Sequence, residues 1–327
     1  MHVVVIYSKY ENLDEDGHHV NPHGAEQMRE TVLGVTEALE KAGHTVTRVE
    51  ASVSLLEDIR AVDNPDVIFN LSAGITNKRH QANFVGMLEM LNIPLVGSGL
   101  STHIMGLHKE VTKIILREAG IPTARSQVFQ DSGEPIRDDF VFPVIVKPEH
   151  EGSSVGVDES SYVEDKETLR RVVHDKMQTY KGAILAEEYL PGREFTIGVL
   201  GNQEPEVLPI KEYVFDEKAG STRFLTVQAK ANDTVTQVCP AELDDALQSE
   251  LQDLARRAFL ALRCRGFARI DFRLDANGRP HVLELNTLPG LQPNYSDFPN
   301  VAQVGGYDYD RLIRHLVELA VQERRYA

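Results

Sequence analysis

The chain has 327 residues, of which 42% are hydrophobic and 26% charged, the composition of a globular protein with two or three domains. Its formal net charge of −16 excludes the basic surface that a nucleic-acid-binding protein needs. No apolar stretch reaches the roughly 18 residues of a membrane span, and Val3–Ile6 lacks the flanks of a signal peptide. Because Cys239 and Cys264 make no disulfide framework, we expect a cytoplasmic protein with reduced thiols.

The first third of the chain alternates predicted strands and helices. We expect strands at His2–Tyr7, His44–Glu50, Asp66–Leu71 and Ile93–Val96, with helices at Ala25–Ala42 and Asn83–Leu91. This order is typical of a parallel sheet whose loops at the strand ends face a ligand. We assign residues 1–107 to this N-terminal α/β domain.

The remaining two thirds predict two further domains, residues 108–187 and 188–327. The elements expected in the first are helices at His108–Ala119 and Lys166–Gln178 and strands at Arg125–Phe129, Val141–Lys147 and Ala183–Tyr189. The second should hold a strand at Glu194–Leu200, helices at Leu243–Arg263 and Tyr309–Arg324, and the hairpin described next. The loops Glu11–Gly24 and Phe215–Thr236 are long and polar, which usually indicates function or disorder.

Two acidic strands near the C-terminal end, Phe267–Leu274 and His281–Asn286, predict a β-hairpin. Asn277-Gly278 between them favours a two-residue type I′ turn. That turn would place Asp271 opposite Glu284 and Arg269 opposite Asn286, on one face of the sheet. Ala268, Ile270, Phe272 and Leu274 would then face a core on the other side.

Opposed carboxylates indicate a cation site on this hairpin. Like charges directly opposite each other destabilise a sheet unless a cation joins them. Mg²⁺ prefers a few hard oxygen ligands and keeps the rest of its shell for water and phosphates. Asp271, Glu284 and Asn286 offer such a set. The alternative is a solvated sheet face with mild repulsion.

A strand that runs into a Gly/Ser loop, Phe142–Gly156, is a candidate phosphate site. Lys147 lies at the strand's end, and Glu151–Gly156 offers backbone N–H groups and two hydroxyls. No Gly-Lys-Ser/Thr opens a helix here, so the segment is not a P-loop. A solvated lysine is the alternative. Further along, the acidic segment Ala183–Thr196 could meet an adenosine, or could be an ordinary acidic hairpin.

Three histidines, His18, His19 and His23, lie in the first long loop. A metal site is one interpretation of them. No Cys or Asp pattern of metal-ligand spacing accompanies them, so the sequence favours a solvated loop.

Together these segments resemble the ATP-grasp superfamily, and most closely the D-alanine–D-alanine ligase family. The matching stretches are Ile93–Gly99, Lys109 with Lys113, Val146–Gly156, Glu187–Thr196, Arg269–Asp271 and Glu284–Gly290. The resemblance implies a three-domain ATP-grasp architecture: an N-terminal parallel αβα domain, and an ATP cleft between the central and C-terminal domains.

The resemblance also implies roles for individual residues in binding nucleotide. Lys109 and Lys147 would hold the ATP phosphates, and Ser153 with Ser154 would lie in the loop that closes over them. The adenine and ribose would meet Glu187, the backbone of Leu190, and Glu194. Lys218, in the second long loop, resembles the family's phosphate-contacting lysine.

For the chemistry, the resemblance implies a carboxylate–amine ligase that works through an acyl phosphate. Asp271, Glu284 and Asn286 would bind two Mg²⁺ ions, with Mn²⁺ as an option. Arg269 and the N–H of Gly290, beside the Ser154 loop, would hold the oxyanion formed during amide synthesis. The partners would be small amino-acid-like substrates, with no nucleic acid or membrane, and a homodimer is an option.

The sequence departs from the family on the amino-acid side. The family's N-terminal Gly-Gly-x-Ser-x-Glu segment is replaced by Ile6–Asn12, and its His-Gly-x-x-Gly-Glu-Asp-Gly stretch by Asn70–Asn77. Ser296 is displaced by one position, and Ala219 replaces the tyrosine after the loop lysine. The residues that could substitute for the missing contacts are Ser8, Glu11, Arg79 and His80. Three functions therefore remain open: D-alanyl-D-alanine synthesis, ligation of other amino or hydroxy acids, and a non-catalytic ATP-binding module.

Overall fold

The computed structural model describes residues 1–8, 24–74, 80–150, 155–215, 224 and 235–323. Its first layer is a parallel sheet in the order β2-β1-β3, formed by Thr45–Glu50, His2–Tyr7 and Val67–Asn70. Alternate residues of β1 face opposite sides. Val3 and Val5 pack with α1 (Gly24–Lys41), and Val4 and Ile6 pack with α2 (Leu55–Arg60) and α3 (Gln81–Glu89). The expected parallel αβα domain is confirmed.

The short strand expected at Ile93–Val96 is wrong. Only an isolated parallel bridge, Ile68 to Leu95, joins this segment to β3. A helix that the sequence did not predict, α4 (Leu100–Leu107), follows it. Gly99 precedes α4, so the usual Ser, Thr, Asp or Asn start signal is missing there. Thr102 holds the helix in place by donating to the carbonyls of Leu262 and Arg263.

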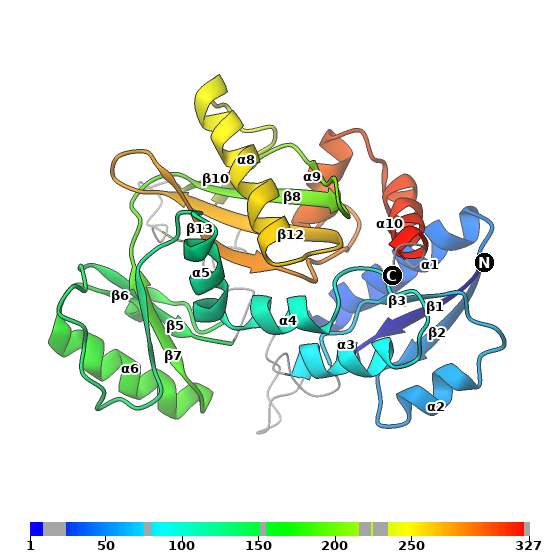
Figure 1. Ribbon diagram of the computed structural model, residues 1–327, viewed down its shortest axis with the longest axis horizontal. Coiled ribbons are helices and arrows are strands. Elements are labelled where there is room, and N and C mark those ends of the chain that lie inside the picture. Colours follow the sequence, from blue (N-terminus) through cyan, green and yellow to red (C-terminus); the bar gives the residue numbers. More distant parts are fainter. Residues whose placement is uncertain (9–23, 75–79, 151–154, 216–223, 225–234, 324–327) are drawn as a thin grey trace.

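The second sheet is antiparallel, in the order β4-β7-β5-β6. In that order, its strands are Ser126–Phe129, Ile184–Glu188, Val144–Pro148 and Tyr162–Val163. A short 3-10 helix, η2 (Glu159–Ser161), comes directly before β6. One face packs against α6 (Lys166–Tyr180) in a separate apolar core. In Figure 1 this sheet and α6 form the lobe at the left, and α4 and α5 (Lys109–Glu118) run between it and the N-terminal lobe.

The third sheet has the order β11-β10-β8-β12-β13, with β9 (Glu206–Val207) also paired to β8. Its strands are Val235–Val238, Lys211–Phe215, Glu194–Gly201, Gly266–Leu274 and Pro280–Asn286. Helix α8 (Asp245–Ala261) covers one face. Ala268, Ile270, Phe272 and Leu274 lie in that core, as predicted.

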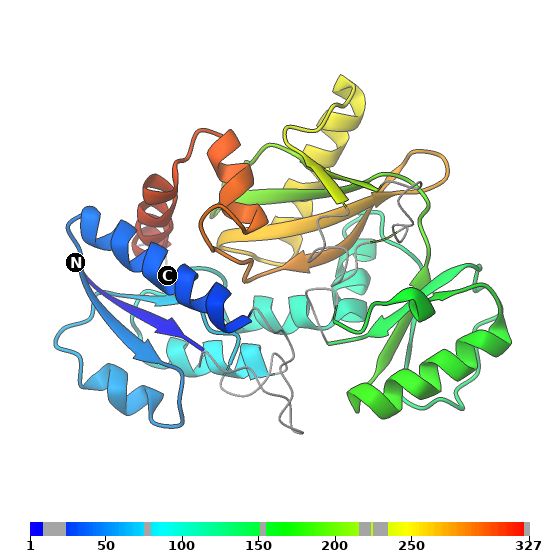
Figure 2. The same cartoon turned by 180° about the vertical axis from the view of Figure 1, so that it is seen from behind.

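The C-terminal helices α9 (Asp297–Val304) and α10 (Tyr309–Glu323) close the molecule against its N-terminal layer. Figure 2 shows α10 lying beside α1. Val32 and Val35 of α1 share one apolar core with Leu312 and Leu316 of α10. Of the described helices, none is both long and apolar enough to cross a membrane.

The hairpin of β12 and β13 has the predicted register but not the predicted turn. Arg269 pairs with Asn286 and Asp271 with Glu284. The loop, however, has three residues, because Asp275 N donates to Arg279 O and Gly278 N to Asp275 O, with Gly278 at φ 78°. The register shifts by one residue between Asp271 and Phe272, which leaves Leu283 as a bulge. The bulge compensates for the longer turn, so the acidic residues still face each other.

The division into residues 1–107, 108–187 and 188–327 remains a proposal. The three sheets nearly follow it, since only β7 extends one residue beyond the second boundary. The apolar cores do not follow it as closely. Leu116, from the helix assigned to the central segment, packs in the core of the third sheet.

Candidate active site

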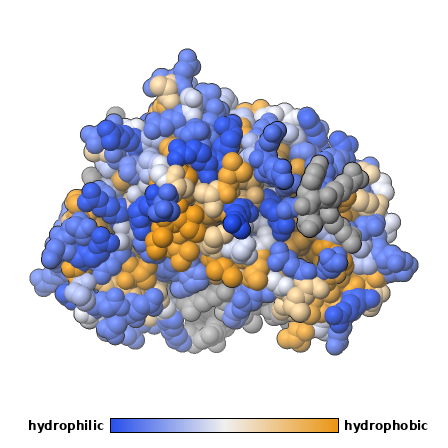
Figure 3. All heavy atoms as spheres, in the orientation of Figure 1, coloured by the Kyte–Doolittle hydropathy of each residue, from blue (hydrophilic) through white to orange (hydrophobic). Residues whose placement is uncertain are grey.

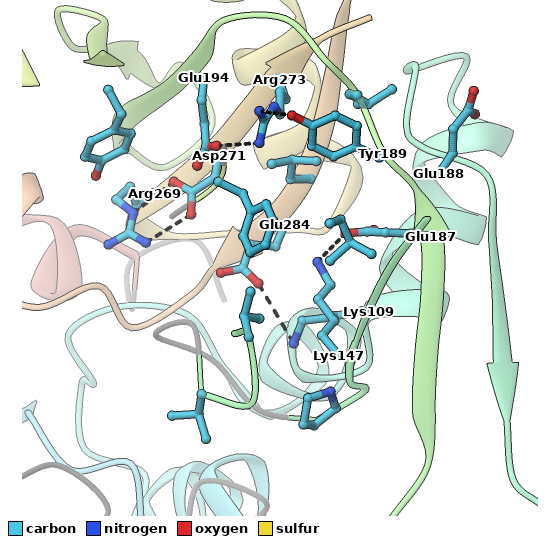
Figure 4. A pocket seen from close by; sticks show the side chains of 18 residues that line it. Lys109, Lys147, Glu187, Glu188, Tyr189, Glu194, Arg269, Asp271, Arg273 and Glu284 are labelled. Carbon is cyan, nitrogen blue, oxygen red and sulfur yellow. Dashed lines mark hydrogen bonds and ion pairs between the residues drawn. The ribbon is translucent and has the colours of Figure 1, made fainter. Parts of the chain in front are cut away.

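A cleft of about 890 Å³ lies between the second and third sheets. Figure 4 shows side chains from both sheets pointing into it. The predicted site residues that line it are Lys109, Lys147, Glu187, Leu190, Glu194, Arg269, Asp271 and Glu284. Side chains predicted from separate segments of the sequence therefore meet in one place.

On the hairpin face, Asp271 is the centre of a hydrogen-bond network. Arg269 Nε and Nη2 each donate to one of its carboxylate oxygens at 3.0 Å, and Thr196 Oγ1 donates to Oδ1 at 2.6 Å. Asn286 Nδ2 donates to Asp271 Oδ2 at 2.9 Å and to Glu284 Oε1 at 3.4 Å. Burial lowers the pKa of Arg269, but Asp271 outweighs it and holds that pKa well above its ordinary value. The predicted metal ligands are thus adjacent. Binding an ion through Asn286 would need its amide turned so that the oxygen faces the ion.

At the opposite wall, Glu187 is enclosed by two lysines. Its Oε1 contacts Lys147 Nζ, and its Oε2 lies 2.9 Å from Lys113 Nζ. Burial would raise the pKa of the Glu187 carboxyl, but the two ammonium groups lower it to about 2. The contact of Glu187 with adenine stays a prediction. The contacts observed are with the lysines, and they fix the position of Lys147 in the cleft.

Lys109, at the first position of α5, links the two walls. Its Nζ donates to the backbone carbonyl of Glu149 at 3.3 Å and lies 3.9 Å from Glu284 Oε2. With Lys147 it supplies two cations at the acidic hairpin. Such a group of lysines and carboxylates fits a polyphosphate bound with a divalent cation, because both signs of charge face the same cleft.

At the end of the cleft predicted to bind adenosine, an apolar side chain lies near a carboxylate that is fixed by an ion pair. Leu190 is buried, and Glu194 Oε2 lies 3.0 Å from Arg273 Nη1. Arg273 also donates to Tyr189 Oη at 3.2 Å and lies over that ring. Sequence reasoning missed Arg273. Its position two residues beyond Asp271 on β12 was the available signal, because alternate residues of a strand share a face.

The end predicted for the oxyanion also contains a residue that sequence reasoning missed, Asp297. Its carboxylate lies 3.7 Å from Arg269 Nη1 and accepts from Lys211 Nζ at 2.8 Å. Asp297 follows Ser296, whose Oγ would be 2.7 Å from a Cβ placed on Gly290. Gly290 is therefore needed for this close approach, and the segment that carries it is near Arg269. Its N–H as an oxyanion donor stays a prediction.

Several predicted residues lie outside the described part of the chain. These are Ser153, Ser154 and Lys218, the substitutes Glu11 and Arg79, and the loop histidines His18, His19 and His23. The roles predicted for them remain predictions.

Of the possible substitutes on the amino-acid side, Ser8 lies in a buried polar network at the carboxyl edge of the first sheet. Its Oγ is 2.9 Å from Ser72 Oγ, and Asn70 bonds the backbone of Ser72 in both directions. His80 is exposed at the start of α3. These groups lie at the carboxyl ends of parallel strands, where such sheets bind ligands, but their hydrogen bonds are made within the protein.

The fold and cleft together define an ATP-grasp protein. Comparison with known proteins agrees: the D-ala D-ala ligase C-terminus family matches residues 114–318. A D-alanine–D-alanine ligase from Erythrobacter litoralis is 35% identical over 88% of this chain and 87% of its own. An uncharacterized protein, y4sG, from Sinorhizobium fredii is also 35% identical, over 89% and 87% of the two chains. The chain belongs to the D-alanine–D-alanine ligase family.

The fold itself matches solved structures over its whole length. The D-alanine–D-alanine ligase from Bacillus anthracis, complexed with ATP, superposes with a TM-score of 0.77 and covers 100% of this chain and 99% of its own, at 21% identity. The fold expected from the sequence is therefore confirmed.

Proposed function

We propose that the protein is an ATP- and Mg²⁺-dependent ligase that joins two small amino acids, with D-alanyl-D-alanine as the product. The observation that supports this proposal is the meeting of Lys109, Lys147 and the Arg269–Asp271 pair with Glu284 at one cleft. The relative from Erythrobacter litoralis named above carries the same activity in its name. We also propose a cytoplasmic location.

The cleft residues suit the activation of a carboxylate. A carboxylate is a poor acyl donor until its oxygen is phosphorylated, and the lysines would neutralise charge on the transferring phosphoryl group. Asp271, Glu284 and Asn286 would hold Mg²⁺, or Mn²⁺, with two ions in the site; a bound divalent ion stabilises phosphate charge during transfer. Arg269, held rigidly in the hairpin, would then stabilise the tetrahedral oxyanion when the amine attacks.

The hairpin contacts explain why a simple nucleotide-binding module is the weaker alternative. Binding of ATP alone would not require an arginine aimed at the acidic ligands, yet Arg269 is partly buried there and bonded to Asp271 through two nitrogens. Ligation of other amino or hydroxy acids is the second candidate. The departure of Asn70–Asn77 from the family's substrate-side segment is what keeps this candidate open.

Phosphate release from Mg·ATP, followed by mass spectrometry of the product, separates the three functions. Turnover with D-alanine as the sole amino acid, giving its dipeptide, supports the proposal. Turnover only with other amino or hydroxy acids from a mixed pool supports the second candidate. Bound ATP without phosphate release in any mixture would leave the non-catalytic module.

We further propose a homodimer formed through α4 and α5. Three apolar side chains are exposed there: Ile104 at 43%, Val111 at 39% and Ile114 at 54%. Figure 3 shows apolar surface gathered over these helices on the face of the molecule seen in Figure 1. Contiguous apolar patches of this kind mark interaction surfaces. Sedimentation equilibrium tests this proposal: the wild type should be a dimer and Ile114→Glu a monomer. The proposal fails if both are monomers.

A further inference from the structure

A cluster of metal-ligating side chains lies beside the cleft and plays no part in the chemistry above. It consists of His108, directly before α5, and Glu149 and His150, directly after β5. Glu149 Oε2 lies 2.9 Å from His150 Nδ1 and 3.4 Å from His108 Nδ1. One ligand atom from each residue lies within 4.8 Å of the others.

Glu149 is fixed with one oxygen aimed between the two imidazoles. Its other oxygen, Oε1, accepts from the backbone N–H of Glu110 at 3.4 Å, in the first turn of α5. The residue is only 3% exposed. Among the described residues, no donor meets the buried Oε2 in hydrogen-bond alignment. A buried carboxylate oxygen in this state carries a large desolvation penalty unless a cation or donor satisfies it.

The geometry fits a tetrahedral transition-metal ion. With metal–ligand bonds of about 2.0–2.1 Å, two ligand atoms of a tetrahedron lie about 3.3 Å apart. The two nitrogen–oxygen separations, 2.9 and 3.4 Å, bracket that value. Imidazole suits Zn²⁺ and its neighbours, whereas Mg²⁺ prefers oxygen ligands alone. We propose that His108, Glu149 and His150 bind one Zn²⁺-class divalent ion, with the remaining position open to water.

Access from solvent supports the same assignment. The two histidine side chains are 38% and 25% exposed, which gives an ion a path from solvent. Their rings meet edge to face with centroids 4.5 Å apart, so the two imidazoles are in direct contact.

Occupancy would join the start of α5 to the end of β5. Lys109 follows His108 directly, and its Nζ already donates to the Glu149 carbonyl. The ion would therefore restrict the movement of Lys109, which lines the cleft. None of the three ligands belongs to β12 or β13, but His150 lines a small pocket together with Glu284 and Asn286 of the hairpin.

The test uses the full chain, stripped with a chelator and titrated with CoCl₂ in the absence of nucleotide and Mg²⁺. Visible absorbance of four-coordinate Co²⁺ should report one such ion per chain. His108→Gln and His150→Gln should each weaken binding at least tenfold, in line with the loss of one of three ligands. His315→Gln is the matched control, since His315 also lies 3.3 Å from a carboxylate, Glu318, but has no second histidine in that pair. Its Co²⁺ affinity should match the wild type.

Glu284→Gln separates this site from the hairpin. Unchanged Co²⁺ binding in that variant supports the proposal, and loss of binding there would assign the ion to the hairpin instead. Equal affinity in the wild type and both histidine variants would also overturn it. A zinc-edge anomalous map from Zn²⁺-soaked crystals needs no variant: a peak between the three side chains supports the site, and peaks only elsewhere refute it.

Discussion

Lys113 and Glu187 form a buried ion pair, with 2.9 Å between Nζ and Oε2 and side-chain exposures of 0% and 5%. The other Glu187 oxygen contacts Lys147, so one carboxylate neutralises two lysines. Burial lowers the pKa of Lys113, while Lys147 keeps a raised pKa because Glu187 outweighs its burial. Glu187 therefore holds Lys147 in the cleft as a cation, and Lys113 fixes Glu187 through its other oxygen.

Removing the shared carboxylate should destabilise the fold. We expect Glu187→Gln to lower the free energy of unfolding by about 3–5 kcal/mol, because it leaves buried charge without a partner. Urea denaturation at pH 7 measures this. Asp253→Asn is the control, since its pair with Arg257 is exposed and should change stability by less than about 1 kcal/mol. Equal effects in the two variants would contradict the buried pair.

The same carboxylate predicts a pH dependence of stability. The pKa of Glu187 is about 2 in the folded protein and 4.5 ordinarily, so the folded state binds this proton less readily than the unfolded state. Its contribution is therefore complete above pH 4.5 and is lost as the pH falls toward 2. The difference in unfolding free energy between wild type and Glu187→Gln should narrow over that window. A constant difference down to pH 3 would show that the pKa is not depressed.

Arg269 should matter for turnover more than for nucleotide binding. We expect Arg269→Ala to lower kcat by about 10²–10³, the effect of removing an oxyanion donor. ATP affinity, measured by calorimetry, should change far less. Arg279→Ala, on the exposed turn of the same hairpin, should leave kcat unchanged. A circular dichroism spectrum that differs from the wild type would instead show that Arg269 is structural, because it also braces Asp271.

The acidic hairpin should make turnover depend on a divalent cation. Chelation of Mg²⁺ should abolish phosphate release, and Mn²⁺ should restore it. Asp271→Asn and Glu284→Gln should each abolish turnover and weaken Mg·ATP binding, since each removes a charged ligand. Glu204→Gln, an exposed carboxylate in the turn after β8, serves as the control. Full turnover in both hairpin variants would refute the metal assignment.

The features that could be predicted from sequence are those with a local or alternating signal. The faces of β12 followed from its two-residue period. The predicted pairing of Asp271 with Glu284 is observed although the predicted two-residue turn is not. The three-residue loop and the Leu283 bulge could not be predicted. The loop shifts the strand register by one residue and the bulge shifts it back, so the alternation of side chains in the sequence shows neither.

Contacts between distant segments left no local signal. Helix α4 was missed because Gly99 gives no capping signal and the helix is held by Thr102 against the distant Leu262 carbonyl. The pairing of Lys113 with Glu187 joins a helix to a strand of another layer. Neither local sequence indicates which distant residue its charged side chain contacts. Asp297 was missed for the same reason, because only the fold brings the start of α9 to Arg269.

The packing of α1 on α10 has a consequence for biosynthesis. Lys41 and Asp310, which form an ion pair between these helices, are 269 positions apart. Chains fold from their N-terminus as they leave the ribosome, but the first layer lacks one wall of its core until the last helix emerges. We expect ribosome-stalled chains that end before α10 to be cleaved by protease within α1, and chains that include it to be protected. Val32 and Val35 would be exposed to chaperones for nearly the entire time of synthesis.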